Sequence, residues 1–96
     1  MLWGNKYGTK GGTGMWTEGK FVIDGIPLMY QAKVFQQPSE LGINEGRISK
    51  LEVTMDLGDG KWHRAFTMII YDRGWTLEPD DDISKKALDY ILKLYD

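Results

Sequence analysis

The stretch Ser39-Glu-Leu-Gly-Ile-Asn-Glu-Gly-Arg-Ile-Ser-Lys-Leu51, which continues as Glu-Val-Thr-Met-Asp56, decides the fold. After Arg47, mostly apolar residues alternate with polar ones. Ser49, Leu51, Val53 and Met55 would lie on one side of a strand, and Lys50, Glu52 and Thr54 on the other. A period of two is typical of a β-strand with one buried face. The glycines and the asparagine before Arg47 permit positive φ angles and mark an irregular loop. We therefore expect a strand over residues 47–56, entered from a long loop over residues 36–46.

Two turn signals predict two β-hairpins. Asp24-Gly25, a dipeptide favoured in type I′ turns, separates the apolar runs 21–23 and 26–35. Gly58-Asp59-Gly60 separates the 47–56 strand from a returning segment over residues 62–71. The last part of that segment, Phe66–Tyr71, is apolar at nearly every position, which suits a central strand covered on both faces.

The C-terminal segment has a helical period. Its apolar residues predict an amphipathic helix of about 13 residues. They are Ile83, Ala87, Leu88, Tyr90, Ile91, Leu94 and Tyr95. Pro79 and the aspartates at 80–82 precede the helix, where its dipole favours negative charge. We expect an α+β fold: a four-stranded antiparallel sheet made of two hairpins, with this helix packed on one face.

The composition is that of one small folded domain. The chain has 96 residues, of which 42% are apolar and 12% are aromatic. Five of the twelve glycines fall within the first 14 residues, among few apolar residues. We expect a flexible glycine-rich arm at residues 1–14 and a single α+β domain at residues 15–96.

Charge and residue types exclude several classes of function. The net charge of −2 argues against strong nonspecific binding of nucleic acid, and no apolar run is long enough to span a membrane. The absence of cysteine excludes disulfides and thiolate sites and favours a cytoplasmic location. The single histidine, His63, has no second histidine or cysteine with which to share a metal, so we expect no metal site and no cofactor. We also expect no enzymatic activity: a metal-independent hydrolase built on Asp72 or Glu45 has the least support.

The second face of the predicted sheet is the first candidate for function. If the registers hold, the residues that alternate toward it include Trp16, Met29, Phe35 and Trp62, together with Val22, Ile48 and Phe66. An apolar face of this kind needs a cover or a partner. The arm and the 36–46 loop could fold over it, a symmetric homodimer could bury it, or a ligand or foreign protein could bind it. A register slip of one residue would invert the assignment.

A polar corner is the second candidate. A hairpin about Asp59-Gly60 would place Arg47 opposite about residue 72. Asn44 and Arg47 would then meet Asp72, Arg73 and Trp75. Two guanidinium groups and an indole suit a phosphorylated nucleotide. The same residues also suit an internal clamp, in which Asp72 pairs with an arginine and Trp75 seals the helix against the sheet.

The motifs Ser39-x-x-Gly-Ile-Asn-x-Gly-Arg-Ile-Ser-Lys-Leu51 and Tyr71-Asp-Arg-Gly-Trp75 resemble those of a small domain family of unknown function from phages, prophages and Gram-positive bacteria. The resemblance covers roughly residues 15–92 and excludes the arm. It brings no catalytic or binding residue, because the family has no assigned activity. It implies a compact accessory protein of a mobile element.

Small proteins of such elements often act by binding. The leading hypothesis is a non-catalytic inhibitor that antagonises a bacterial defence system by binding a host protein through Trp16, Met29, Phe35 and Trp62. The alternatives are sequestration of a phosphorylated nucleotide by Arg47, Arg73 and Trp75, and a structural domain without a ligand.

Overall fold

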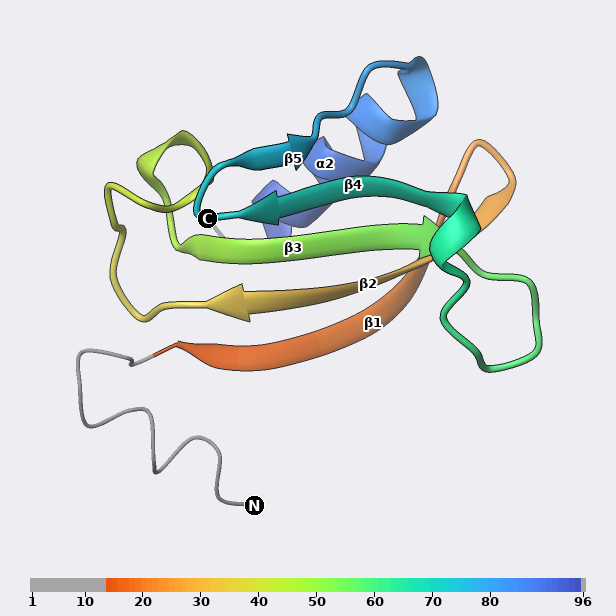
Figure 1. Cartoon of the computed structure of the whole chain (residues 1–96), viewed down its shortest axis with the longest axis horizontal. Helices are drawn as coiled ribbons and strands as arrows, with labels where there is room; N and C mark the ends of the chain where they lie inside the picture. Colours follow the sequence, from red (N-terminus) through yellow and green to blue (C-terminus); the bar gives the residue numbers. More distant parts are fainter. Residues whose placement is uncertain (1–13, 96) are drawn as a thin grey trace.

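The structure, a computed structural model, describes residues 14–95; the predicted arm therefore lies outside the described range except for Gly14. The strands are β1 (Met15–Ile23), β2 (Ile26–Val34), β3 (Ile48–Met55), β4 (Thr67–Asp72) and β5 (Trp75–Leu77). Two 3-10 turns, η1 (Ile43–Glu45) and η2 (Arg64–Phe66), precede β3 and β4, and the helix α2 (Asp82–Tyr95) ends the chain. The strands form one antiparallel sheet in the order β1-β2-β3-β4-β5, and α2 crosses one face of it (Figure 1). We call this the helix face and the opposite one the helix-free face.

The predicted α+β class, the antiparallel sheet and the C-terminal helix are confirmed, but the sheet has five strands and not four. The additional strand, β5, pairs with β4, with Trp75 opposite Tyr71. The chain reverses at Arg73, whose φ of +57° is left-handed, and the Asp72 N–H donates to the Gly74 carbonyl at 2.9 Å. A strand of three residues is too short to show a period of two, so the residue pattern could not reveal it.

The first hairpin is confirmed. β1 and β2 pair in continuous register from Met15 opposite Val34 to Ile23 opposite Ile26. Asp24 and Gly25 form the turn with φ angles of +50° and +81°, which glycine and aspartate tolerate better than most residues.

The core lies between the helix face and α2. The two helix residues at its centre, Ala87 and Ile91, are 0% exposed. At one side Phe21 stacks on Tyr90 with ring centroids 4.7 Å apart. Near the helix C-terminus the hydroxyls of Tyr30 and Tyr95 are hydrogen-bonded. Burial, and then this hydrogen bond, raise the pKa of Tyr30 well above its usual range.

The helix begins at an aspartate cap. The Ser84 N–H donates to Asp81 Oδ1 at 2.7 Å, and the Ser84 hydroxyl contacts the same carboxylate at 2.8 Å. These hydrogen bonds lower the pKa of the Asp81 carboxyl. The predicted apolar stripe is corrected at its edges: Leu94 is 50% exposed and Tyr90, although stacked on Phe21, is 40% exposed, while Leu92 packs against the core.

A β-bulge between β2 and β3 overturns one predicted orientation. The pairing shifts between Lys33, which lies opposite Lys50, and Val34, which lies opposite Ile48. Ser49 is the extra residue, so the alternation changes there. Ile48 is therefore 0% exposed within the core, and its predicted place on the second face is wrong.

The 36–46 loop packs on the helix side of the molecule and not over the helix-free face. Ile43 is 1% exposed and belongs to the core cluster. The Tyr71 hydroxyl, on the helix face, donates to the Leu41 carbonyl at 2.9 Å. This loop therefore extends the core, and the prediction that it covers the second face is wrong.

Candidate functional site

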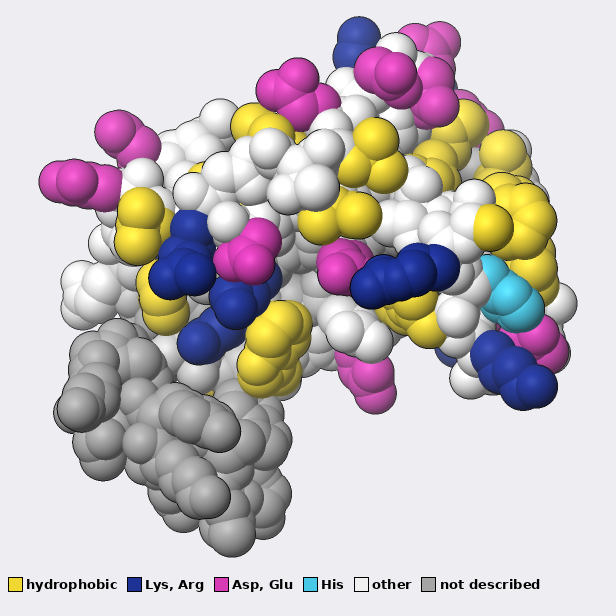
Figure 2. Space-filling view, in the orientation of Figure 1, with side chains coloured by type: hydrophobic (Ala, Val, Ile, Leu, Met, Phe, Trp, Pro, Cys, Tyr) yellow, Lys and Arg dark blue, Asp and Glu magenta, His cyan; other side chains and the backbone are white. Residues whose placement is uncertain are grey.

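One row of side chains crosses four strands on the helix-free face. Trp16 lies opposite Lys33, Lys33 opposite Lys50, and Lys50 opposite Asp72. Residues directly opposite one another in an antiparallel sheet share a face. The neighbouring Thr17 contacts Tyr95 of α2, which places this row on the side away from the helix. We call these four residues the basic row. Figure 2 shows Lys and Arg side chains gathered on this face, where β2 ends and β3 begins.

The charges of the basic row are only partly balanced. Asp72 Oδ1 lies 3.7 Å from Lys50 Nζ and 3.5 Å from Arg73 Nε. The side chains of Asp72 and Arg73 are 52% and 59% exposed, and such exposed pairs contribute no more than about 1 kcal/mol each. Lys33 adds a third positive charge beside Lys50. The end of this face therefore carries an excess of positive charge.

An acidic row runs beside the basic row. Glu18 lies opposite Gln31, Gln31 opposite Glu52, and Glu52 opposite Ile70. Residues of both rows line a hollow of about 160 Å³. Its lining includes Trp16, Gln31, Lys50 and Thr76. A second hollow of about 370 Å³ continues from Glu18 toward Trp62. The helix-free face is thus a shallow surface with stripes of opposite charge.

The four predicted partner-surface residues differ in accessibility. Trp16 is 43% exposed, whereas Met29 is 8% exposed. Trp62 and Met29 line the same hollow on the helix-free face, and Phe35 lines another with Trp16. Only Trp16 among them projects as a large exposed apolar group.

The 56–66 segment is the cover that the sequence reasoning missed. It returns over the helix-free face, where the Thr54 hydroxyl donates to the His63 carbonyl at 3.0 Å. Within the described part of the chain, the buried Trp62 Nε1 has no hydrogen-bond partner, so packing holds this indole. The segment therefore covers the end of the face that lies beyond the acidic row.

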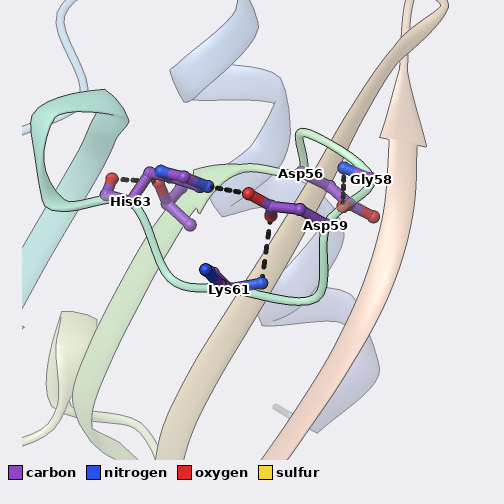
Figure 3. Close-up of polar contacts among 6 residues, drawn as sticks. Asp56, Gly58, Asp59, Lys61 and His63 are labelled. Atoms are coloured by element: carbon purple, nitrogen blue, oxygen red, sulfur yellow. Dashed lines mark hydrogen bonds and ion pairs between the residues drawn. The ribbon is translucent and has the colours of Figure 1, made fainter.

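Asp59 organises this segment (Figure 3). Its carboxylate accepts the Lys61 N–H at 3.1 Å and contacts His63 Nε2 at 2.7 Å. The hydrogen bond from Lys61, and then that from His63, lower the pKa of the Asp59 carboxyl. Asp56 forms a similar turn with the Gly58 N–H. These contacts give His63 a structural role in the 56–66 segment. His63 lies in a loop and not in the predicted returning strand over residues 62–71.

The structure does not assemble the predicted corner around Arg47. Asp72 lies opposite Lys50, three residues further along β3 than predicted. The Arg47 guanidinium turns to the other side, where Nε donates to the Phe35 carbonyl at 2.9 Å and Nη1 to the Tyr95 carbonyl at 2.6 Å. Arg47 therefore connects the end of β2 to the C-terminus of α2, while Asp72 faces the helix-free side.

Asn44 stays with Arg47 in a hollow of about 420 Å³ next to Leu92. Its left-handed φ of +55° is as predicted for this loop, but the loop uses its own donors. Five of its N–H groups donate inside the loop: Ser39 to Gly46, Leu41 and Gly42 to Ser39, Glu45 to Gly42, and Gly46 to Ile43. These N–H groups are not available to bind an anion.

Trp75 and Arg73 lie at the end of the sheet where β4 ends and β3 begins, but their side chains do not meet Arg47. The Trp75 ring packs edge-on against Tyr71, with centroids 4.9 Å apart, and stays 37% exposed. The Arg73 N–H donates to the Ser49 carbonyl at 2.9 Å, which fixes the turn, while its side chain remains exposed. Of the predicted ligand residues, only Asp72 belongs to the basic row, and Arg73 lies beside it.

Part of this row could have been found from the sequence. A two-residue turn at Asp24-Gly25 fixes the register of β1 and β2 and thereby pairs Trp16 with Lys33. Lys50 could not be placed opposite Lys33, because the bulge at Ser49 changes the register.

Residues 14–95 contain no group of three or more His, Asp or Glu side chains arranged to hold a metal ion. Over the same range, no helix is long and apolar enough to cross a membrane.

Residues 15–96 match one family model, described as Domain of unknown function (DUF7678), and the chain belongs to this family. The predicted membership of a domain family of unknown function is therefore confirmed. No curated protein and no solved structure matches the chain.

Proposed function

We propose that this member of a family of unknown function is a non-catalytic binding protein that holds a partner protein on the helix-free face of its sheet. The observation that carries the proposal is the exposed Trp16, at the head of the basic row and beside the acidic row. An exposed tryptophan next to polar groups of both signs is typical of the centre of a protein interface.

The alternation of charge favours a protein partner over a polyanion. Glu18 and Glu52 of the acidic row lie next to Lys33 and Lys50 and would repel a phosphate backbone. A protein surface can instead match both stripes, with acidic groups opposite the lysines and basic groups opposite the glutamates. The partner expected here presents such a striped surface and an apolar site for Trp16.

Two observations support a non-catalytic role. Ser49 and Ser84 are each 1% exposed, and Ser84 is hydrogen-bonded to Asp81, the cap of α2. His63 is held by Asp59 in the 56–66 segment. The resemblance of the motifs to those of phage and prophage proteins supports a bacterial defence protein as the partner, bound and inhibited in the host cytoplasm.

The test compares two exposed tryptophans. Trp16→Ala removes the proposed anchor, whereas Trp75→Ala removes an indole of similar exposure at β5. The tagged wild type is expected to retain a host protein from lysate, Trp75→Ala to retain it equally, and Trp16→Ala to lose it. With the purified partner, Trp16→Ala is expected to weaken binding by roughly thirtyfold or more, the effect of losing about 2 kcal/mol at an interface hot spot. Equal binding by both variants would contradict the proposal.

Capture of a phosphorylated nucleotide is the second candidate, supported by the gathering of positive side chains where β2 ends and β3 begins (Figure 2). Lys33 lies opposite Trp16 and Lys50, and Lys50 and Arg73 both contact Asp72. Because Arg47 and Trp75 lie elsewhere, this candidate now rests on the basic row. It predicts that a nucleotide raises the melting temperature of the wild type by mass action and that Lys50→Ala abolishes the rise. A panel of linear and cyclic nucleotides without any shift would eliminate it.

A further inference from the structure

One edge of the sheet is long and open. β1 has nine residues and pairs on one side only, whereas the opposite edge strand, β5, has three. An edge strand presents unpaired N–H and C=O groups that can pair with another strand. The described residues supply no strand on the outer side of β1.

The hydrogen bonds of β2 show which groups of β1 point outward. The Asp56 N–H donates to the Pro27 carbonyl, and the Phe35 N–H donates to the Arg47 carbonyl, so odd-numbered residues of β2 bond toward β3. Even-numbered residues of β2 therefore bond toward β1, and their partners in β1 are odd-numbered. The N–H and C=O groups of the even-numbered residues 16–22 of β1 consequently point toward the free edge.

The side chains of these four residues have a symmetric order. Along the helix-free face of β1 they run apolar, acidic, basic, apolar: Trp16, Glu18, Lys20 and Val22. All four are exposed, and Val22 is 62% exposed although it is apolar. Within the described residues Lys20 has one ion pair, with Asp56 at 3.7 Å, and the Lys20 side chain is 66% exposed.

We propose that β1 pairs with β1 of a second copy of this chain, antiparallel and symmetric about Gly19. In this register Glu18 lies opposite Lys20 of the second copy, and the reverse pair forms on the other side of the axis. Trp16 lies opposite Val22 of the second copy at each end. The sequence around Gly19 is thus complementary to itself when reversed, which is what an isologous interface requires.

The charges select this register over its neighbours. Keeping the outward N–H and C=O groups aligned allows shifts of two residues only. One such shift would centre the pair on Glu18 and the other on Lys20, and each would place like charges directly opposite each other. Gly19 leaves no side chain at the axis, and the space above it on the helix face is filled by Tyr30, whose Cε2 would lie 2.8 Å from a Cβ on Gly19. The dimer would carry a continuous sheet, with the helix-free faces of both copies on one side.

This inference does not depend on the proposed function, and reciprocal charge exchange tests it. The wild type is expected to show reversible dimerisation by sedimentation velocity. Glu18→Lys and Lys20→Glu are each expected to weaken the dimer by roughly ten- to hundredfold, because both symmetric ion pairs become repulsive. The double variant Glu18→Lys/Lys20→Glu restores opposite charges and is expected to recover the dimer. Asp56→Asn is the matched control, since it removes the ion pair of Lys20 but leaves β1 unchanged.

Residue-resolved hydrogen exchange locates the interface. The amides of Glu18 and Lys20 are expected to exchange more slowly as protein concentration rises, while those of Thr17 and Gly19, bonded to β2 in either state, do not change. A monomer at all soluble concentrations would overturn the proposal. So would a dimer that both single variants retain, or protection of Glu18 and Lys20 that does not depend on concentration.

Discussion

Gly42→Ala is expected to lower the free energy of unfolding by about 3 kcal/mol, a large part of the roughly 5–14 kcal/mol typical of a domain of this size. A Cβ at this position would lie 2.1 Å from the carbonyl oxygen of Gly46 and 2.8 Å from its carbon. Both atoms belong to the backbone, so no side-chain rotation can relieve the overlap. The loop must open instead.

Opening the loop would disturb the core. The Gly46 carbonyl accepts the Ser39 N–H at 2.9 Å, which closes the loop, and the closed loop holds Ile43 at 1% exposure. Withdrawing a buried isoleucine from a core costs about 2–5 kcal/mol when it is complete. Because the loop can shift partway, the expected loss lies within that range.

Urea unfolding, followed by the fluorescence of the tryptophans, measures this effect. Gly74→Ala is the control, since a Cβ on Gly74 meets no heavy atom within 4 Å and its φ is not left-handed. The control is expected to change stability by no more than about 0.5 kcal/mol. If Gly42→Ala and Gly74→Ala were equally stable, the close approach of the Gly46 backbone would not be what requires a glycine at position 42.

The elements that the sequence predicted correctly are those with repeated local signals. The alternation after Arg47, the Asp24-Gly25 turn and the helical stripe after Asp82 each involve several residues with the same period. Each signal is local, so no knowledge of the rest of the chain was needed. β5 was missed because its three residues carry no period and depend on the turn at Arg73.

The candidate site was harder to predict because it depends on register. A single extra residue at Ser49 moved Ile48 into the core. A separate irregularity in the β3–β4 pairing, between Val53 and Thr54, accompanies the register that places Lys50, not Arg47, opposite Asp72. Bulges are not marked by a residue pattern, and one position of slip moves every later side chain to the other face. The residue types of the corner were therefore identified, but their spatial grouping was not.

Arg47→Ala is the other substitution with a large expected effect: a loss of about 2–4 kcal/mol in the free energy of unfolding, since hydrogen bonds to a charged group are worth about 1.5–3 kcal/mol each. Its guanidinium donates to the Phe35 carbonyl and to the Tyr95 carbonyl at the C-terminus of α2. The positive charge also favours the negative end of the helix dipole. Arg47→Lys keeps the charge but not the planar fork, so about half of the loss is expected to remain.

Arg73→Ala is the matched control, because the Arg73 side chain is 59% exposed and its pair with Asp72 is 3.5 Å long. A change within about 0.5 kcal/mol is expected for it. Faster hydrogen exchange at the end of α2 in Arg47→Ala alone would assign the loss to detachment of the helix.

Comparing the stabilities of Arg47→Ala and Arg73→Ala decides whether Arg47 serves a ligand site or an internal clamp, the two roles that the sequence left open. A side chain kept for a ligand at the expense of stability should leave the free protein equally or more stable when it is removed. If Arg47 instead holds β2 and α2 together, its removal should make the free protein less stable. If Arg47→Ala proved as stable as Arg73→Ala, the hydrogen bonds to Phe35 and Tyr95 would not hold the helix, and Arg47 and Asn44 would regain their place as a candidate ligand site in the hollow beside Leu92.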